Sequence, residues 1–172
     1  NNIFSDANGE PTDLFYGFLG GLQKHMNEAL LIFAPYVNSY RRLASPWSSP
    51  VNLAWAIDNR TVGLRVPDSP PEARRIENRL AGSVVNPYLV IAATLACGYL
   101  GMIGKLQPTE ATEGSDYGDD HSLHRHIFSA IDAMRESKGM RSLLGDAFVD
   151  LYIALKEYEY REFQEIITPY ER

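Results

Sequence analysis

Seven arginines and no lysine lie between residues 41 and 79 of a chain whose formal net charge is −6. Only four carboxylates share this window, so it is net positive within an acidic protein. A guanidinium presents a fixed fork of donors that matches carboxylate and phosphate oxygens, which a lysine ammonium does not. The cluster therefore predicts a site for a small anion, and a solvated basic face with surface ion pairs is the alternative. The net negative charge argues against general nucleic-acid binding.

Glu77 lies between two of these arginines, Arg75 and Arg79. In a β-strand the three side chains would share one face, because side chains alternate across a strand. Magnesium usually takes one or two carboxylates together with substrate phosphates. The spacing is therefore compatible with Glu77 binding a divalent cation while the arginines hold anionic substrates, as phosphoryl transfer requires. A ladder of surface ion pairs would show the same spacing.

The sequence pattern predicts an α+β fold, in which a short antiparallel sheet and packed helices position these residues. Strand-like segments cover 52–57, 61–66 and 75–80, and the turn residues 58–60 predict a hairpin between the first two. Apolar residues at helical spacing predict a helix from Thr12, as N-cap, to about Phe33. Asn86 predicts the start of another helix, and 122–137 and 143–167 predict two more, the last with an apolar face. Residues 37–50 predict a loop or short turns. The apolar face of the last helix is Phe148, Leu151, Tyr152 and Leu155.

An uncharged run of eighteen residues, 87–104, reaches the lower limit for a membrane span. Its glycines and tyrosines, and its lack of flanking basic anchors, predict the central buried helix of a soluble domain instead. The single cysteine, Cys97, excludes a disulfide within the chain, and the first residues resemble no signal peptide. A reducing, cytoplasmic location is the prediction.

Ordered motifs along nearly the whole chain resemble those of the glutamine synthetase superfamily. They are Asn38-Ser39-Tyr40-Arg41-Arg42-Leu43, Pro50-Val51-Asn52-Leu53-Ala54-Trp55, Asp58-Asn59-Arg60-Thr61, Arg75-Ile76-Glu77 with Arg79, and Asn86-Pro87-Tyr88-Leu89. Several motifs in the right order with compatible gaps are a specific signal, although each alone is weak. The chain is most similar to the γ-glutamylputrescine synthetase, or glutamate–amine ligase, branch.

The resemblance implies an ATP-dependent ligase that joins glutamate to a small amine or, in ammonia-using relatives, to ammonia. The glutamate side-chain carboxylate would be phosphorylated and the acyl phosphate then attacked by the amine. Arg42 and Arg79 resemble the arginines that hold glutamate. Arg60 resembles the catalytic arginine that neutralises the phosphoryl group in transit.

The resemblance also implies ATP and Mg²⁺ (or Mn²⁺) as cofactors. Arg65 and Arg75 resemble the arginines that contact the ATP phosphates. Glu77 matches a ligand of the second metal site. For these residues, as for Arg42, Arg60 and Arg79, the alternative is an ordinary surface charge.

Two departures from the family bear on specificity and regulation. Ammonia-using enzymes carry a glutamate three residues before the position of Val51, where this chain has Ser48. A small neutral side chain there favours an organic amine as acceptor, and Trp47 would line its pocket or serve as a packing anchor. Tyr117 lacks the sequence setting of the family's regulatory tyrosine, so regulation by adenylylation is not carried over.

A second polar cluster, at 119–126, combines two aspartates with three histidines. Such side chains can bind zinc or nickel. The cluster falls at a predicted loop-to-helix junction, however, and a solvated helix start is the preferred interpretation. Its members are Asp119, Asp120, His121, His124 and His126.

The resemblance implies that residues 1–172 are the C-terminal part of the catalytic domain. The family's N-terminal domain and the first half of the catalytic domain, with the remaining metal ligands, precede the position of Asn1. The chain is therefore expected to be a fragment that is inactive when isolated, from a full-length protein that forms stacked hexameric rings. A non-catalytic relative that uses the fold for binding or structure is the alternative from outside the enzymes.

Overall fold

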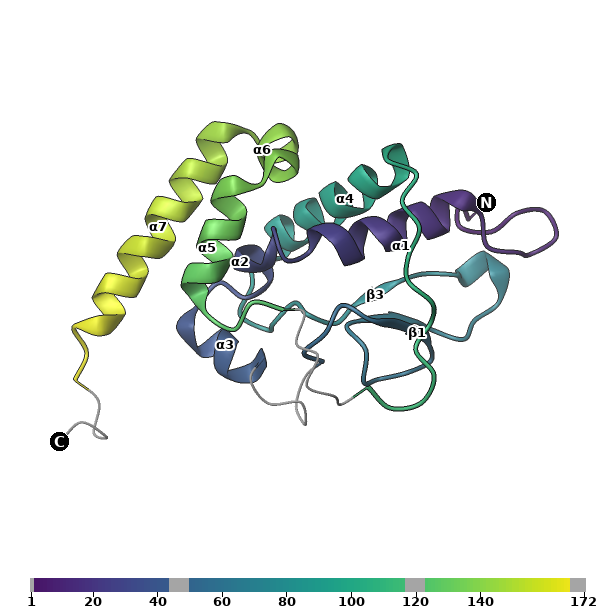
Figure 1. Ribbon diagram of the computed structural model, residues 1–172, viewed down its shortest axis with the longest axis horizontal. Coiled ribbons are helices and arrows are strands. Elements are labelled where there is room, and N and C mark those ends of the chain that lie inside the picture. Colours follow the sequence, from purple (N-terminus) through teal and green to yellow (C-terminus); the bar gives the residue numbers. More distant parts are fainter. Residues whose placement is uncertain (1, 44–49, 117–122, 168–172) are drawn as a thin grey trace.

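The computed structural model describes residues 2–43, 50–116 and 123–167, which form the expected α+β arrangement (Figure 1). Helices α1 and α4 lie side by side over a small sheet, and α5, α6 and α7 pack together at the other end of the molecule. The elements are α1 (Asp13–His25), α2 (Leu30–Phe33), α3 (Val37–Leu43), β1 (Trp55–Ile57), β2 (Leu64–Val66), the 3-10 turn η1 (Pro71–Ala73), β3 (Glu77–Asn78), α4 (Pro87–Ile103), α5 (Ile127–Glu136), α6 (Lys138–Leu144) and α7 (Asp146–Gln164).

Both predicted helix caps are present. The Thr12 side chain accepts from the Phe15 N–H at 3.3 Å, and Asn86 accepts from the N–H groups of Tyr88 and Leu89. These bonds satisfy donors that have no partner within the helix itself. The first helix ends at His25, however, and residues up to Phe33 form the separate short helix α2.

Helices α1 and α4 approach each other through glycines. A Cβ on Gly101 would lie 2.1 Å from the Gly17 carbonyl oxygen, and one on Gly21 would lie 2.4 Å from the Cys97 carbonyl oxygen. Side chains at these positions would separate the two helices, so the glycines set how closely the helical layer packs. Cys97 is fully buried beside this contact, and burial raises the pKa of its thiol to about 12. The thiol therefore stays protonated and is no nucleophile.

The predicted hairpin between the first two strands is wrong. β1 and β2 pair in parallel, with Trp55 opposite Leu64 and Ile57 opposite Val66. Only β2 and β3 are antiparallel, and β3 has two residues. Residues 58–63 bring the chain back to the level of Trp55, so that β2 starts opposite the start of β1. The Asn52 side chain holds this segment. Its Oδ1 accepts from the Gly63 N–H at 3.0 Å, and its Nδ2 donates to the Thr61 carbonyl at 3.3 Å.

We expect Asn52→Ala to lower the free energy of unfolding by about 2–3 kcal/mol, because it leaves buried backbone groups without partners. Asn52 is only 5% exposed. Urea denaturation measures the change. The matched control is Asn8→Ala at an exposed site, where the change should stay within about 0.5 kcal/mol. Equal losses in the two variants would show that Asn52 does not hold the return segment.

Three predictions about where helices lie are also wrong. Residues 37–43 form α3 and not a loop, because Tyr40 and Leu43 pack into the core. The predicted helix at 143–167 is split at Gly145, which has a φ of +88°, a value that glycine adopts readily. The helix expected from residue 122 begins at Ile127.

The buried face of α7 also differs from the predicted one. Val149, Ile153 and Lys156 are buried, while Leu151 and Leu155 of the predicted apolar face are 71% and 47% exposed. Phe148 and Tyr152 pack partly against the core. The buried face of α7 is therefore rotated relative to the predicted one. The helix packs on α5 and α6, and the apolar pattern alone did not indicate which positions these contacts would bury.

Helix α4 is not buried on all sides in this chain. One side packs on α1, and the other exposes apolar residues at helical spacing, namely Tyr88, Ile91, Leu95, Tyr99 and Ile103. Within the described residues, no helix has both the length and the apolar character needed to cross a membrane.

Candidate active site

Arg60 projects from a turn that is braced on both sides. Asn59 Nδ2 donates to the Gly114 carbonyl at 2.6 Å, and Thr61 Oγ1 accepts from the Asp116 N–H at 2.8 Å. Asn59 Oδ1 also accepts from the Thr61 N–H. The Arg60 side chain is exposed and makes no hydrogen bond or ion pair with any described residue. A fixed backbone thus presents a guanidinium that is available to an anion.

Arg79 is brought to the same turn. Its Nη1 donates to the Arg60 carbonyl and, at 3.2 Å, to the Val62 carbonyl. One end of the Arg79 guanidinium therefore supports the backbone that carries Arg60. The sequence pattern gave no sign of this second role.

Arg42 lines a cavity of about 270 Å³ between α3 and residues 82–84. Its Nη2 donates to the Leu80 carbonyl at 2.5 Å, next to Arg79 in the chain. Burial lowers the pKa of Arg42 from its ordinary value. Ser39 lines the same cavity, and its buried Oγ has no partner among the described residues. A partly buried cation and an unsatisfied hydroxyl thus line the same cavity. Both can donate hydrogen bonds to a small carboxylate.

Arg65 and Glu77 lie opposite each other on β2 and β3. Arg65 Nη1 donates to both carboxylate oxygens of Glu77, at 3.1 and 3.0 Å, and Arg65 Nη2 donates to Asp58 Oδ1. These hydrogen bonds, first that to Glu77 and then that to Asp58, raise the pKa of Arg65. Asp58 was assigned no role from the sequence, where it was the first residue of a turn and of one family motif. The sequence feature that could have indicated its role is the position of this carboxylate, two residues before Arg60.

Arg75 does not lie beside Glu77 on a strand face, as the alternation predicted. The strand comprises only Glu77–Asn78, and exposed Arg75 donates to the Ala73 carbonyl at 3.2 Å. Arg74 is structural, since it donates to the Ser5 hydroxyl at 2.7 Å and the Gly9 carbonyl at 2.9 Å. The seven arginines of the window therefore have different surroundings.

The donor set around Glu77 fits a magnesium ion bound together with phosphates. Within the described residues no group of three metal-binding side chains occurs, but magnesium needs only one or two carboxylates when phosphates supply further ligands. The Glu77 side chain is 38% exposed, so its oxygens can be reached from solvent. Asp58 is a nearby carboxylate that is held by the other end of Arg65.

Several residues singled out in the sequence cannot be placed. Ser48, Trp47, Tyr117, Asp119, Asp120 and His121 lie outside the described residues. His124 and His126 precede α5, and burial lowers the pKa of His124. The described part of the acidic and histidine cluster forms no metal site.

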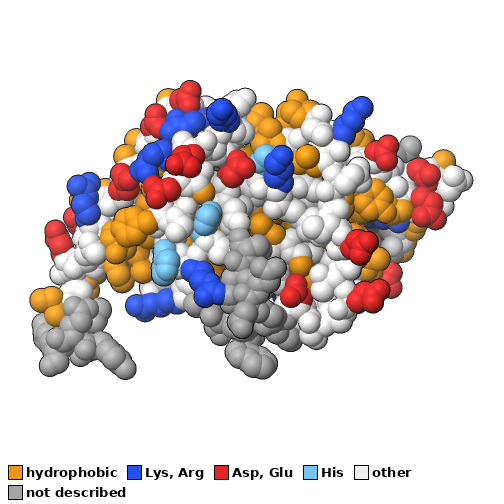
Figure 2. Space-filling view, in the orientation of Figure 1, with side chains coloured by type: hydrophobic (Ala, Val, Ile, Leu, Met, Phe, Trp, Pro, Cys, Tyr) orange, Lys and Arg blue, Asp and Glu red, His pale blue; other side chains and the backbone are white. Residues whose placement is uncertain are grey.

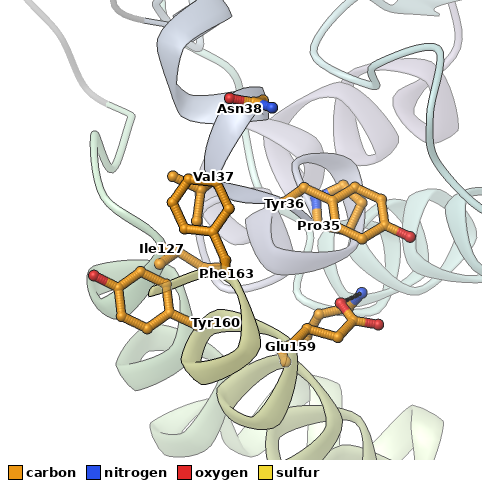
Figure 3. A pocket seen from close by; sticks show the side chains of 9 residues that line it. Pro35, Tyr36, Val37, Asn38, Ile127, Glu159, Tyr160 and Phe163 are labelled. Carbon is orange, nitrogen blue, oxygen red and sulfur yellow. Dashed lines mark hydrogen bonds and ion pairs between the residues drawn. The ribbon is translucent and has the colours of Figure 1, made fainter. Parts of the chain in front are cut away.

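A separate pocket of about 190 Å³ lies between the start of α3 and the last turns of α7 (Figure 3). Its polar end is the buried Lys156, which donates to Glu159 at 2.8 Å and lies 4.4 Å from the centre of the Tyr36 ring. Apolar side chains such as Ile127 and Phe163 form most of its wall. The six predicted site residues take no part in lining it, so it is distinct from the arginine cluster.

Charges at the helical end of the molecule are largely paired with one another. Arg135 contacts Asp132 and Glu157, and Arg141 contacts Asp146 and Asp150. Figure 2 shows positive and negative side chains interspersed over this end of the molecule. This surface therefore resembles a solvated face and not an anion site.

Comparison with known proteins gives a consistent result over the whole chain. The model of the family "Glutamine synthetase, catalytic domain" matches residues 1–172. A type-1 glutamine synthetase of Dictyostelium discoideum is 35% identical over 99% of this chain and 34% of its own length. The γ-glutamylputrescine synthetase PuuA of Escherichia coli is 36% identical over 97% of this chain and 36% of its own length. A glutamate–isopropylamine ligase of a Pseudomonas species is 34% identical over 95% of this chain and 36% of its own length.

Solved structures indicate the same family. One described as "Apo GmaS without ligand" has a TM-score of 0.84 with this chain at 31% identity, and the match covers 100% of this chain and 40% of that one. The chain thus spans about a third of the length of the curated relatives that it matches. From the match over its full length, this chain belongs to the glutamine synthetase catalytic-domain family.

Proposed function

We propose that the protein containing this chain is an ATP-dependent ligase that forms a γ-glutamyl amide from glutamate and an amine. The observation that carries the proposal is the continuous arrangement of Arg42, Arg79 and Arg60, in which Arg42 binds the Leu80 carbonyl and Arg79 binds the Arg60 carbonyl. One short segment after β3 thus links a carboxylate-sized cavity to an exposed arginine. Family membership supports the same class of reaction.

The proposed reaction has two steps. The γ-carboxylate of glutamate attacks the terminal phosphorus of ATP, and the bond from phosphorus to ADP breaks. The amine nitrogen then attacks the acyl carbon, inorganic phosphate leaves, and the new amide nitrogen loses a proton. Because both steps move negative charge, fixed guanidinium groups stabilise their transition states.

Each arginine has a role that suits its surroundings. Arg42, partly desolvated in its cavity, would hold a glutamate carboxylate together with Arg79. Arg60, which has no partner among the described residues, would neutralise the phosphoryl group in transit. Arg65 and Arg75 would contact ATP phosphates, and Glu77 would bind Mg²⁺ or Mn²⁺. The metal, held by Glu77, would neutralise negative charge on the phosphates.

The acceptor is proposed to be an organic amine. Ser48 replaces the glutamate that ammonia-using members carry, and relatives named for putrescine and isopropylamine ligation are similar to this chain. Relatives named glutamine synthetase are similar to the same degree, so ammonia is the second candidate acceptor. A non-catalytic relative of the fold is a third proposal, and no feature of the described site favours it.

The acceptor is tested with the full-length gene product, by phosphate release from ATP in the presence of glutamate and one acceptor at a time. We expect kcat/KM for the best amine of a panel that includes putrescine and isopropylamine to exceed that for ammonium by about tenfold or more. Ser48→Glu should reverse the order. Equal turnover with ammonium alone would refute the amine preference. Phosphate release independent of glutamate would refute the ligase.

This chain alone is proposed to be inactive, because its relatives are about three times as long. The full-length protein is proposed to be a homo-oligomer. Sedimentation of the full-length product and of residues 1–172, with the same assay on each, tests both points.

A further inference from the structure

Arg65 is held between two carboxylates of unequal accessibility. Its Nη1 contacts both oxygens of Glu77 and its Nη2 contacts Asp58. The Arg65 side chain is 18% exposed, whereas those of Glu77 and Asp58 are 38% and 57% exposed. The two ends of one guanidinium therefore serve different partners.

The sheet fixes this arrangement. Arg65 is in the central strand, with Ala56 of β1 on one side and Glu77 of β3 on the other. Asp58 follows β1 directly, and its N–H donates to the Val66 carbonyl at 2.8 Å. Asp58 has a φ of +47°, a left-handed conformation that aspartate tolerates better than most residues. In the parallel register Ala56 lies opposite Arg65, so Asp58 comes two residues beyond that level, within reach of Arg65 Nη2.

Each Glu77 oxygen keeps a second lone pair while it accepts from Arg65 Nη1, so a cation can reach it, but the positive guanidinium lies against the same carboxylate. A divalent cation bound at those oxygens would repel the adjacent guanidinium and weaken its contact through Nη1. Without a second carboxylate, Arg65, whose side chain is 18% exposed, would then keep no full counter-charge among the described residues. Asp58 offers such a carboxylate at Nη2, so the guanidinium can keep a counter-charge while Nη1 turns to another acceptor such as a phosphate oxygen.

We infer that Asp58 is a positioning residue that retains Arg65 and so makes Glu77 available to a divalent cation. The inference rests on the proposed role of Glu77 as a metal ligand. Asp58 acts through Arg65 and does not itself bind the cation.

Two other roles for Asp58 predict different results. As a direct ligand, or as a distant negative charge that attracts the cation, Asp58 would act whether or not Arg65 is present. As one member of an ordinary surface ion pair, it would contribute little, because exposed pairs are weak. A double-mutant cycle separates these cases.

The test is a titration of the full-length gene product with Mn²⁺ without nucleotide, in which electron paramagnetic resonance counts free Mn²⁺. Asp58→Asn keeps the shape of the side chain and removes its charge. We expect the dissociation constant for Mn²⁺ to rise about tenfold, as when other groups that orient a metal ligand are removed. In an Arg65→Gln background, Asp58→Asn should have no further effect.

Equal weakening in both backgrounds would overturn the inference, because Asp58 would then act without Arg65. No weakening in the wild-type background would overturn it as well. The matched control is Asp132→Asn, which breaks an exposed pair with Arg135 of similar type and should leave Mn²⁺ binding unchanged. Thermal unfolding of each variant verifies that the fold is retained.

Glu77→Gln distinguishes the failure of this inference from the failure of the proposed function. We expect this variant to lose one Mn²⁺ site. If it retains all of them, the metal role of Glu77 is refuted and the inference with it. If it loses the site while Asp58→Asn binds normally, only the role of Asp58 is refuted.

Discussion

Arg60→Gln is expected to lower kcat of the full-length protein by about 10³-fold, the smaller effect seen for arginines that stabilise a phosphoryl group in transit. KM for ATP and for glutamate should change little, because such an arginine acts mainly in the transition state. The Arg60 side chain has no partner in the described part of the chain, so its loss should leave the fold intact. Steady-state phosphate release at saturating substrates measures the effect.

The matched control for this variant is Arg161→Gln on the exposed surface of α7, where the arginine lies near the Tyr158 ring and has no hydrogen bond or ion pair with the described residues. Its kcat should remain that of the wild type. A large rise in KM with unchanged kcat in Arg60→Gln would instead assign Arg60 to ground-state binding. Equal kcat in the two variants would remove Arg60 from the chemistry altogether.

Gly101→Ala is expected to destabilise the protein by at least about 3 kcal/mol, at the upper end of the cost of overpacking. In a helix interior this substitution normally stabilises, by about 1 kcal/mol. Here the added Cβ would meet the Gly17 carbonyl oxygen at 2.1 Å and the Gly21 Cα at 2.4 Å. Both neighbours are backbone atoms, so relief requires that α1 and α4 move apart. Urea denaturation measures the effect.

The matched control for the helix contact is Gly82→Ala. The nearest atom to a Cβ there is Arg42 Nη2 at 3.6 Å, an ordinary contact, and the φ of Gly82 is not in the left-handed region. Its stability should change by less than about 1 kcal/mol. A stabilised Gly101→Ala variant would show that the two helices tolerate a wider separation than the structure has.

Features that depend on neighbouring residues could be predicted from the sequence. The caps Thr12 and Asn86 were correct because a capping side chain bonds to backbone two or three positions away. The start of α4 and the α+β class followed from similar local signals. The family was apparent from motifs whose order and spacing are properties of the sequence itself, and the match over 1–172 confirms it.

The candidate site was predicted only in part. The resemblance supplied Arg42, Arg60, Arg65, Arg75, Glu77 and Arg79, whose roles remain proposals. The alternation argument predicted the wrong neighbours for Glu77, because β3 is too short to align Arg75 and Arg79 with it. Its actual partner, Arg65, lies on another strand twelve residues earlier in the chain.

Tertiary structure alone decided how distant segments meet. The sequence at 52–66 contains a turn and two apolar segments, and these fit a hairpin as well as the observed parallel pair. In the parallel pair, Asn52 bonds to Thr61 and Gly63 of the connecting segment. This pairing places Asp58 beside Arg65. Similarly, packing on α5 and α6 decided which face of α7 is buried. Composition and spacing thus determined the fold class, the helix caps and the family. The pairing of strands and charges depended on contacts between residues far apart in the sequence, whose energies no local pattern encodes.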